Sequence, residues 1–159
     1  MVDQKKTSLI KEFVMSKLSK KVIGVDVGAK FLTVSFTDNV NQDQVFNIQN
    51  NQRSILSFLK KFPTEDYCLA IEATGNYSSR ILHLSLDNGF ESSLINCMSV
   101  KYFSRMKNII SKTDAEDAKV IRLYGEIFRP EVYIPKSIEI EHLDQEIKLL
   151  NDLEEEKRR

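Results

Sequence analysis

The chain has 159 residues, of which 42% are hydrophobic and 29% charged, and its 23 basic and 23 acidic side chains cancel. This composition is ordinary for a globular protein and excludes a disordered or collagen-like chain. A formal charge of zero gives the whole chain no electrostatic attraction to nucleic acid or to a membrane. The charge is nevertheless uneven, because basic residues outnumber acidic ones over 101–130 and the reverse holds over 131–159.

The two cysteines, Cys68 and Cys97, lie in apolar contexts without the spacing of a metal cluster, and no signal peptide precedes them. We expect two reduced core thiols in a cytoplasmic protein. No apolar run approaches the roughly 20 residues that cross a bilayer, so we expect no membrane partner.

Taken in chain order, residues 1–20 have apolar side chains at helical spacing and are expected to form a helical extension. A β-hairpin is predicted over 21–37, because β-branched residues from Val22 to Val27 favour a buried strand and Gly28 allows the reversal. The further predicted elements are a strand at 44–48, a helix from Asn50 or Asn51 to before Pro63, a strand at 67–72, a helix that Asn88-Gly89 closes, a strand at 91–95, and helices over 99–109 and from 111 to about 124.

Three successive strands followed by strand–helix alternation predict an α/β fold with a mixed five-stranded sheet flanked by helices, of the ribonuclease H type. We assign 21–130 to one catalytic domain. Residues 131–159 are assigned to a linker and the start of a coiled-coil helix, because apolar residues recur at a loose heptad spacing from Ile138 to Leu153. No helix-ending signal precedes the last residue, so we expect a fragment of a longer protein.

Asp26 is unusual because it interrupts a buried strand, where a carboxylate costs several kcal/mol unless it is paired or binds a metal. Glu72 ends another strand, and the carboxyl ends of parallel strands meet at one edge of a sheet. Asp114 and Asp117 lie three residues apart at a helix start and share one helix face. Four carboxylates in one place would suit Mg²⁺ or Mn²⁺ and metal-dependent phosphodiester chemistry.

A structural alternative exists for the helical acids. Acidic residues are favoured in the first turn of a helix by its dipole, and Thr113 with Glu116 matches a capping box.

Three stretches resemble the three motifs of one transposase family: Gly24–Lys30, Glu72–Tyr77 and Lys112–Ala118. This is the DEDD family of insertion-sequence type one-hundred-and-ten, which includes the pilin-gene invertases. The resemblance covers about residues 20–130 and matches the four carboxylates above to the metal-binding D, E, D and D of the family, in the same order.

The resemblance implies a RuvC-like catalytic domain of a site-specific recombinase that cleaves and transfers DNA strands with Mg²⁺ or Mn²⁺. Many members are guided by an RNA that the element encodes. The resemblance also implies a coiled coil that joins protomers and a C-terminal domain with a nucleophilic serine. That domain is absent from these residues, so we expect the fragment to be inactive alone. Two departures are Asn96-Cys97, where relatives commonly have Asn-Pro, and an acidic rather than basic start to the coiled coil.

Lys101–Lys107 interleaves bases with aromatic residues, as surfaces for single strands and RNA often do. The residues predicted to contact nucleic-acid phosphates are Lys101, Arg105, Lys107, Lys112 and Arg122. The alternative is an amphipathic helix with Tyr102, Phe103 and Met106 in the core.

Other functions stay open at this point. One is a stand-alone RuvC-like structure-specific nuclease with the same fold. Another is an ATP-binding domain of the actin and sugar-kinase type, because Asp26–Lys30 is similar to the phosphate-contacting hairpin of that superfamily. The third is an inactivated regulatory domain.

Overall fold

The computed structural model describes residues 20–38, 40–109 and 113–135, together with residues 146, 147, 150, 153, 154 and 157. Residues 1–19 of the helical extension predicted over 1–20 lie outside the described residues, as does most of the predicted coiled-coil helix.

The predicted elements are present, with small shifts at their ends. Their observed order is β1 (Lys21–Val27), β2 (Phe31–Thr37), β3 (Asp43–Gln49), α2 (Gln52–Leu59), β4 (Tyr67–Glu72), α3 (Asn76–Asp87), β5 (Ser92–Ile95), α4 (Cys97–Met106) and α5 (Asp114–Phe128). The helix α4 begins earlier than predicted because the Asn96 side chain accepts a hydrogen bond from the Met98 N–H and caps it. The helix α5 continues past Tyr124 and ends at Arg129, whose backbone is left-handed.

The five strands form one mixed sheet in the order β3-β2-β1-β4-β5. Strand β2 is antiparallel to both β1 and β3, whereas β4 is parallel to both β1 and β5. An antiparallel meander joined to two parallel strands is the arrangement of the ribonuclease H-like, RuvC-like fold, so the predicted fold class is confirmed.

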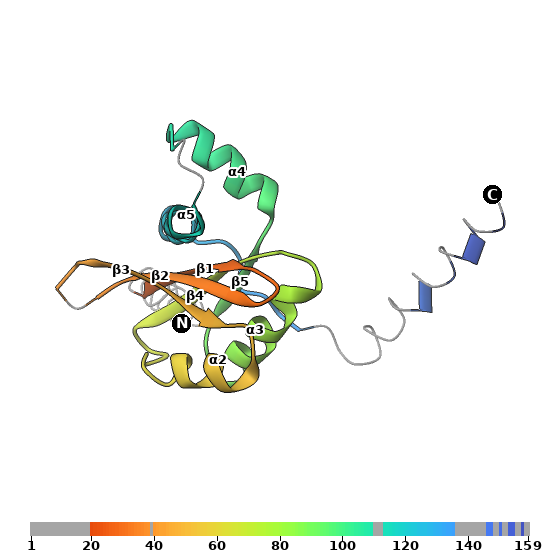
Figure 1. Ribbon diagram of the computed structural model, residues 1–159, viewed down its shortest axis with the longest axis horizontal. Coiled ribbons are helices and arrows are strands. Elements are labelled where there is room, and N and C mark those ends of the chain that lie inside the picture. The colour runs from red at the N-terminus through yellow and green to blue at the C-terminus, as the bar shows by residue number, and fades with distance from the viewer. Residues whose placement is uncertain are drawn as a thin grey trace, which may run out of the picture.

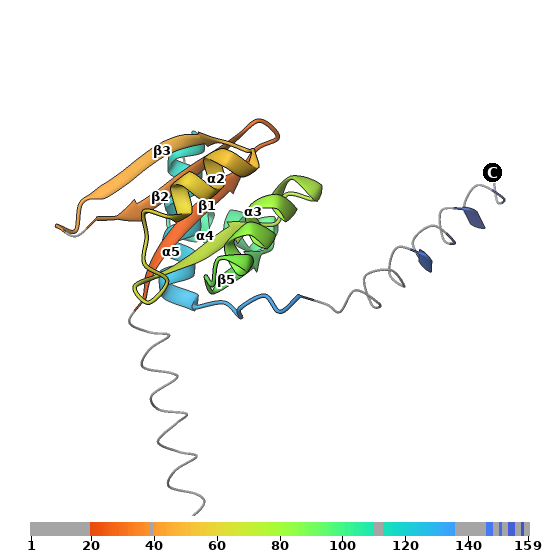
Figure 2. The ribbon, with the colours of Figure 1, turned by 90° about the horizontal axis from the view of Figure 1, so that it is seen from below.

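Helices cover both faces of the sheet: α2 and α3 lie on one face, and α4 and α5 on the other (Figures 1 and 2). Side chains alternate along β1 between the two layers. Ile23, Val25 and Val27 belong to the core under α2 and α3, whereas Val22 belongs to the core under α5. The period of two places Asp26 on the α5 face with Val22.

The helix α5 lies unusually close to the sheet at two glycines. A Cβ on Gly24 of β1 would overlap the Ala118 carbonyl oxygen and the Arg122 backbone nitrogen of α5. A Cβ on Gly125 of α5 would lie 2.8 Å from both Ala70 Cβ and Val22 Cγ1. This contact sets the height of α5 above β1, and therefore the distance of its first turn from Asp26.

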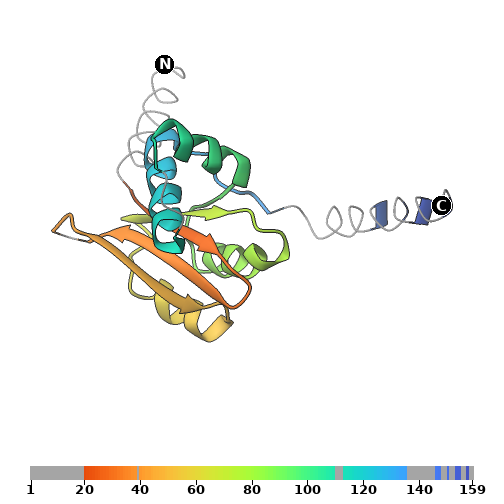
Figure 3. The same ribbon diagram turned by 45° about the horizontal axis from the view of Figure 1, so that its top comes forward.

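The helix α4 follows the edge strand β5 and packs against the outer side of α5, the next helix in the chain (Figure 3). The Phe103 ring of α4 packs edge-on against the Tyr124 and Phe128 rings of α5, with centroids 5.6 Å apart in both pairs. The buried side chains of α4 are Val100 and Phe103, so a narrow stripe of this helix anchors it.

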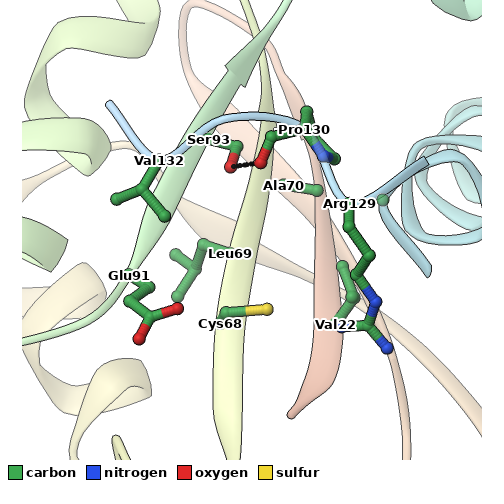
Figure 4. Close-up of a pocket in the computed structure, with 10 residues that line it drawn as sticks. Val22, Cys68, Leu69, Ala70, Glu91, Ser93, Arg129, Pro130 and Val132 are labelled. Atoms are coloured by element: carbon green, nitrogen blue, oxygen red, sulfur yellow. Dashed lines mark hydrogen bonds between the residues drawn. The ribbon is translucent and has the colours of Figure 1, made fainter. Parts of the chain in front are cut away.

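The segment after α5 runs along β5, the edge strand of the sheet (Figure 4). The Ser93 hydroxyl donates to the Pro130 carbonyl at 3.0 Å, and the Tyr133 N–H donates to the Ser92 carbonyl at 2.7 Å. A cavity of about 20 Å³, large enough for one water molecule, lies beneath the segment, between Val22, Ala70 and Arg129. These contacts cover backbone groups that an edge strand otherwise leaves exposed. No helix among the described residues is both long and apolar enough to cross a membrane.

Replacing Gly24 with alanine tests the seating of α5. The added methyl group meets backbone atoms that cannot rotate away, so we expect Gly24→Ala to destabilise the domain by at least about 2 kcal/mol, or about 4–8 °C in Tm for a chain of this size. Ser57→Ala, at an exposed position of α2, is the control and should leave Tm unchanged. Thermal unfolding followed by circular dichroism measures both. An unchanged Tm in Gly24→Ala would show that α5 is not held against β1 as described.

Candidate active site

Two of the predicted carboxylates are neighbours in the sheet. Strands β1 and β4 run parallel with Val25 opposite Ile71, so the next residues, Asp26 and Glu72, lie side by side at the carboxyl ends of their strands. Glu72 has the same parity as Ala70, which belongs to the core under α5. Both carboxylates therefore face the α5 side, and a hydrogen bond between their carboxyl groups is among the causes that raise the pKa of Asp26.

The first turn of α5 brings the other two predicted carboxylates to this edge. The Thr113 hydroxyl accepts a hydrogen bond from the Glu116 N–H at 3.2 Å, which fixes where the helix begins. The sheet-facing side of α5 carries Ala118 and Ile121, which are fully buried; Asp114 lies one turn before Ala118, and Asp117 lies one turn before Ile121. Glu116 points elsewhere and forms an ion pair with Lys119 at 3.1 Å.

The four carboxylates interact through their charges. The pKa of Asp26 is raised from 3.8 to about 7, first by burial and then by the carboxylates of Glu72, Asp117 and Asp114. A protonated Asp26 can donate to Glu72, which relieves the repulsion while no cation is present. The structure thus brings all four predicted acids into electrostatic contact around Asp26.

The donor set suits a hard divalent cation, because it consists of carboxylate oxygens. Among the described residues, no group of three or more His, Cys, Asp or Glu side chains is placed so that it could hold a metal ion. Mg²⁺ does not need such a group, since it commonly keeps several waters and binds through one or two carboxylates together with substrate phosphates. An open edge with spread carboxylates therefore fits Mg²⁺ or Mn²⁺ better than a metal that demands tight all-protein coordination.

Cys97 adjoins this edge, a position that the sequence analysis missed when it assigned the residue to the core. Its thiol is partly exposed and donates to the Ala73 carbonyl at 2.9 Å. Burial raises the pKa of the thiol, as do the Glu72 carboxylate and a hydrogen bond with it. Cys97 comes two residues after the end of β5, which is parallel to β4, so the strand order contained the signal that would have placed it here.

Asn50 also supports the site without having been predicted to do so. Its side-chain amide donates to the Gly28 carbonyl at 3.0 Å and to the Tyr77 carbonyl at 3.2 Å. Arg80 of α3 donates to the Asn50 carbonyl. Asn50, which is 6% exposed, therefore ties the turn after Asp26 to the first turn of α3.

Three of the residues predicted to contact phosphates lie exposed on α4 or at its C-terminal end. Lys101 and Arg105 line a groove of about 670 Å³ that Glu72 and Asp117 also line. Lys107 lies over the Phe103 ring, 5.9 Å from its centroid. Lys112 is outside the described residues.

The alternative interpretation of α4, with three apolar side chains in the core, is wrong for two of them. Tyr102 is 60% exposed and Met106 is 67% exposed, whereas Phe103 is buried. The helix packs on α5 through one narrow face, and Tyr102 and Met106 lie outside that face.

Arg122 has a structural role, in contrast to its predicted one. It is 5% exposed, and its guanidinium forms ion pairs with Asp43 and Glu126, both at 2.8 Å. It also donates to the hydroxyls of Ser35 at 3.3 Å and Thr37 at 2.8 Å. These bonds tie α5 to β2 and β3, and they leave the guanidinium no free face for a phosphate.

Comparison with known proteins identifies relatives over most of this chain. The model of the DEDD, IS110-type family, described as a transposase, matches residues 23–159. The pilin gene-inverting protein of Moraxella lacunata is 30% identical over 138 residues, and that of Moraxella bovis is 29% identical over 137 residues. Each match covers 83% of this chain and 40% of the relative, so the chain spans about 40% of the length of the curated relatives it matches. A solved structure of T. thermophilus RuvC in complex with a Holliday junction substrate has a TM-score of 0.47 and 14% identity, and covers 72% of this chain and 99% of that one.

The raised pKa of Asp26 predicts how stability depends on pH. Folding keeps a proton on Asp26 that the unfolded chain releases above its ordinary pKa of 3.8. This contribution to stability is complete below that value and is lost as the pH rises through about 7. Because Asp26 is partly exposed, solvent reduces the effect to about 1 kcal/mol.

We therefore expect the Tm of the metal-free protein to fall by about 2–4 °C between roughly pH 5 and pH 8 because of this group. Asp26→Asn, which does not ionise, should remove that part of the decline. Differential scanning calorimetry of both proteins across this range measures it. If the Tm of the two proteins changed with pH in the same way, the raised pKa assigned to Asp26 would be contradicted.

Proposed function

This chain belongs to the IS110 family of DEDD transposases, and from that premise we propose that it is a catalytic domain that breaks phosphodiester bonds in DNA with bound divalent cations. The observation that carries the proposal is the gathering of Glu72, Asp114 and Asp117 around Asp26, whose pKa they raise. Mutual repulsion of this kind costs folding free energy, and a bound cation would offset it.

In this proposal Asp26, Glu72, Asp114 and Asp117 hold Mg²⁺ or Mn²⁺. When bound, such ions activate an oxygen nucleophile and stabilise the leaving oxygen of a phosphodiester. With a cation bound, Asp26 would be ionised, so that it and Glu72 would both offer carboxylate oxygens as ligands. The first turn of α5 carries Asp114 and Asp117 on a helix that Arg122 and the contact at Gly24 hold rigidly to the sheet. Rigid support of this kind keeps the ligands oriented without reorganisation.

DNA is the proposed substrate, and α4 supplies its phosphate contacts. Lys101 and Arg105 are exposed beside the groove that the carboxylates line, and Lys107 extends the positive charge along the same helix. We omit Arg122 from this surface because its guanidinium is already paired. Lys112 keeps its predicted role as a phosphate contact.

For the whole protein we propose strand cleavage and transfer in the cytoplasm by a homo-oligomer, guided by an element-encoded RNA. The homo-oligomer forms through the coiled-coil helix, and a serine-bearing domain completes strand transfer, so the 159 residues alone do not recombine DNA. Support comes from family membership and from the name of the Moraxella relatives, which are pilin gene-inverting proteins. Family membership also disfavours the ATP-binding alternative. Metal-dependent cleavage of branched DNA by the 159 residues alone would instead favour the stand-alone nuclease.

Removing single carboxylates tests the metal site. We expect Mn²⁺ binding, measured by isothermal titration calorimetry at neutral pH, to fall at least about tenfold in Asp26→Asn and in Asp117→Asn, since each variant loses a ligand. The Tm of the metal-free variants should stay equal to or above that of the unmodified protein, because repulsion is relieved. Asp87→Asn, at an exposed position of α3, is the matched control. Unchanged Mn²⁺ affinity in the site variants would refute the assignment.

Charge removal on α4 tests the DNA surface. Each phosphate contact contributes about 0.9 to the slope of log K against log salt concentration for duplex DNA. The double variant Lys101→Ala/Arg105→Ala should therefore lower that slope by about 2. Lys60→Ala, on the opposite face of the sheet, should leave it unchanged. Fluorescence anisotropy with a labelled duplex in Ca²⁺, which prevents turnover, measures both, and equal slopes would exclude these contacts.

A further inference from the structure

The groove between α4 and α5 has a composition that the carboxylate site alone does not explain. Its volume of about 670 Å³ falls in the range of about 300–1,000 Å³ typical of small-ligand sites. Glu72 and Asp117 are among its lining residues, so the groove adjoins the proposed metal site.

Part of the lining of the groove is apolar. Val100 and Ile121 are buried and belong to the core between α4 and α5, and Ile109 packs against the same core. Met98, at the start of α4, adds an exposed thioether to the lining. A flat apolar group can lie against such a surface, whereas a phosphate cannot.

The rim is polar and positively charged. Lys101 and Arg105 are one turn apart on α4 and both line the groove, and Asn108 follows at the end of that helix. The Asn108 amide carries both donors and an acceptor, the combination that base edges require. Apolar lining residues, an amide and two cations beside a metal site match a nucleotide, with its base inside and its phosphates outside.

We propose, on the basis of the function proposed above, that this groove receives one unpaired nucleotide of the DNA strand whose phosphodiester lies at the carboxylates. Its base lies against Val100 and Ile109, and a flanking phosphate contacts Lys101 or Arg105. A paired base cannot enter, because both faces of a stacked base pair are covered and its edge is joined to the second strand. Enzymes that need access to a base accommodate it by unstacking, and a mismatched or single-stranded base costs least to unstack.

Ser104 offers a matched pair of variants for the test. Its hydroxyl lies in the lining and donates to the Ile109 carbonyl at 3.0 Å. Ser104→Ala and Ser104→Leu both remove this bond, but only the leucine fills the groove. A difference between the two variants therefore reports the effect of filling the groove, because both lose the same hydrogen bond.

The experiment uses an oligonucleotide with one unpaired 2-aminopurine, in Ca²⁺, and follows both affinity and 2-aminopurine fluorescence. For the unmodified chain and Ser104→Ala we expect a rise in fluorescence as the base leaves its neighbours. Ser104→Leu should abolish the rise and weaken binding about tenfold, the typical contribution of one stacked or buried base. A fully paired duplex with the same label should give no rise.

Three results would overturn the proposal: equal affinity and fluorescence for Ser104→Leu and Ser104→Ala, no fluorescence rise in the unmodified chain, or a rise with the matched RNA strand only. Mn²⁺ titration of the same variants separates this inference from the function on which it rests. If the chain binds Mn²⁺ and DNA but 2-aminopurine fluorescence does not respond, only the inference about the groove is refuted. If the unmodified chain binds neither Mn²⁺ nor DNA, the proposed function is refuted as well.

Discussion

The arrangement of this domain depends on the repulsion among carboxylates around Asp26. Burial and three acidic neighbours hold the pKa of Asp26 near 7, far above that of a solvated aspartate. A protein selected for stability alone would not keep such a cluster, because each charge raises the cost of the next. The fold tolerates it because two parallel strands, β1 and β4, and the start of one helix, α5, are fixed independently by apolar packing on the α5 side of the sheet.

The packing of α5 against the sheet positions the two acids in its first turn at the site. Gly24 allows its backbone to approach β1, Gly125 allows the approach further along the helix, and the guanidinium of Arg122 joins it to Asp43 on the opposite side of the meander. These contacts involve Ala118, Arg122 and Gly125, which follow Asp114 and Asp117 along the helix. The body of α5 therefore holds the two acids of its first turn at the sheet edge. In the proposed function, metal affinity and domain stability therefore depend on the same helix, α5.

Much of this could be predicted from local sequence. The β-branched run before Asp26 identifies a buried strand, the reversal at Gly28 identifies the hairpin, and Thr113 identifies the start of α5, because each signal acts between near neighbours. The role of Arg122 could not be predicted, since its partners on β2 and β3 are separated from it by about half the chain and only packing brings them together. The sequence could not decide between the two interpretations of α4 for a similar reason: the width of the buried stripe on α4, which leaves Tyr102 and Met106 exposed, is set by α5 and not by α4 itself.

The account rests on one arrangement, in which a divalent cation lies between the ends of β1 and β4 and the first turn of α5. The most direct test is anomalous X-ray diffraction from a crystal of this chain soaked in Mn²⁺. The account predicts an anomalous peak within direct or water-bridged coordination distance of Asp26, together with Glu72 or Asp117. Manganese peaks confined to other surfaces, with the Asp26 and Glu72 carboxyl groups still hydrogen-bonded to each other, would contradict it.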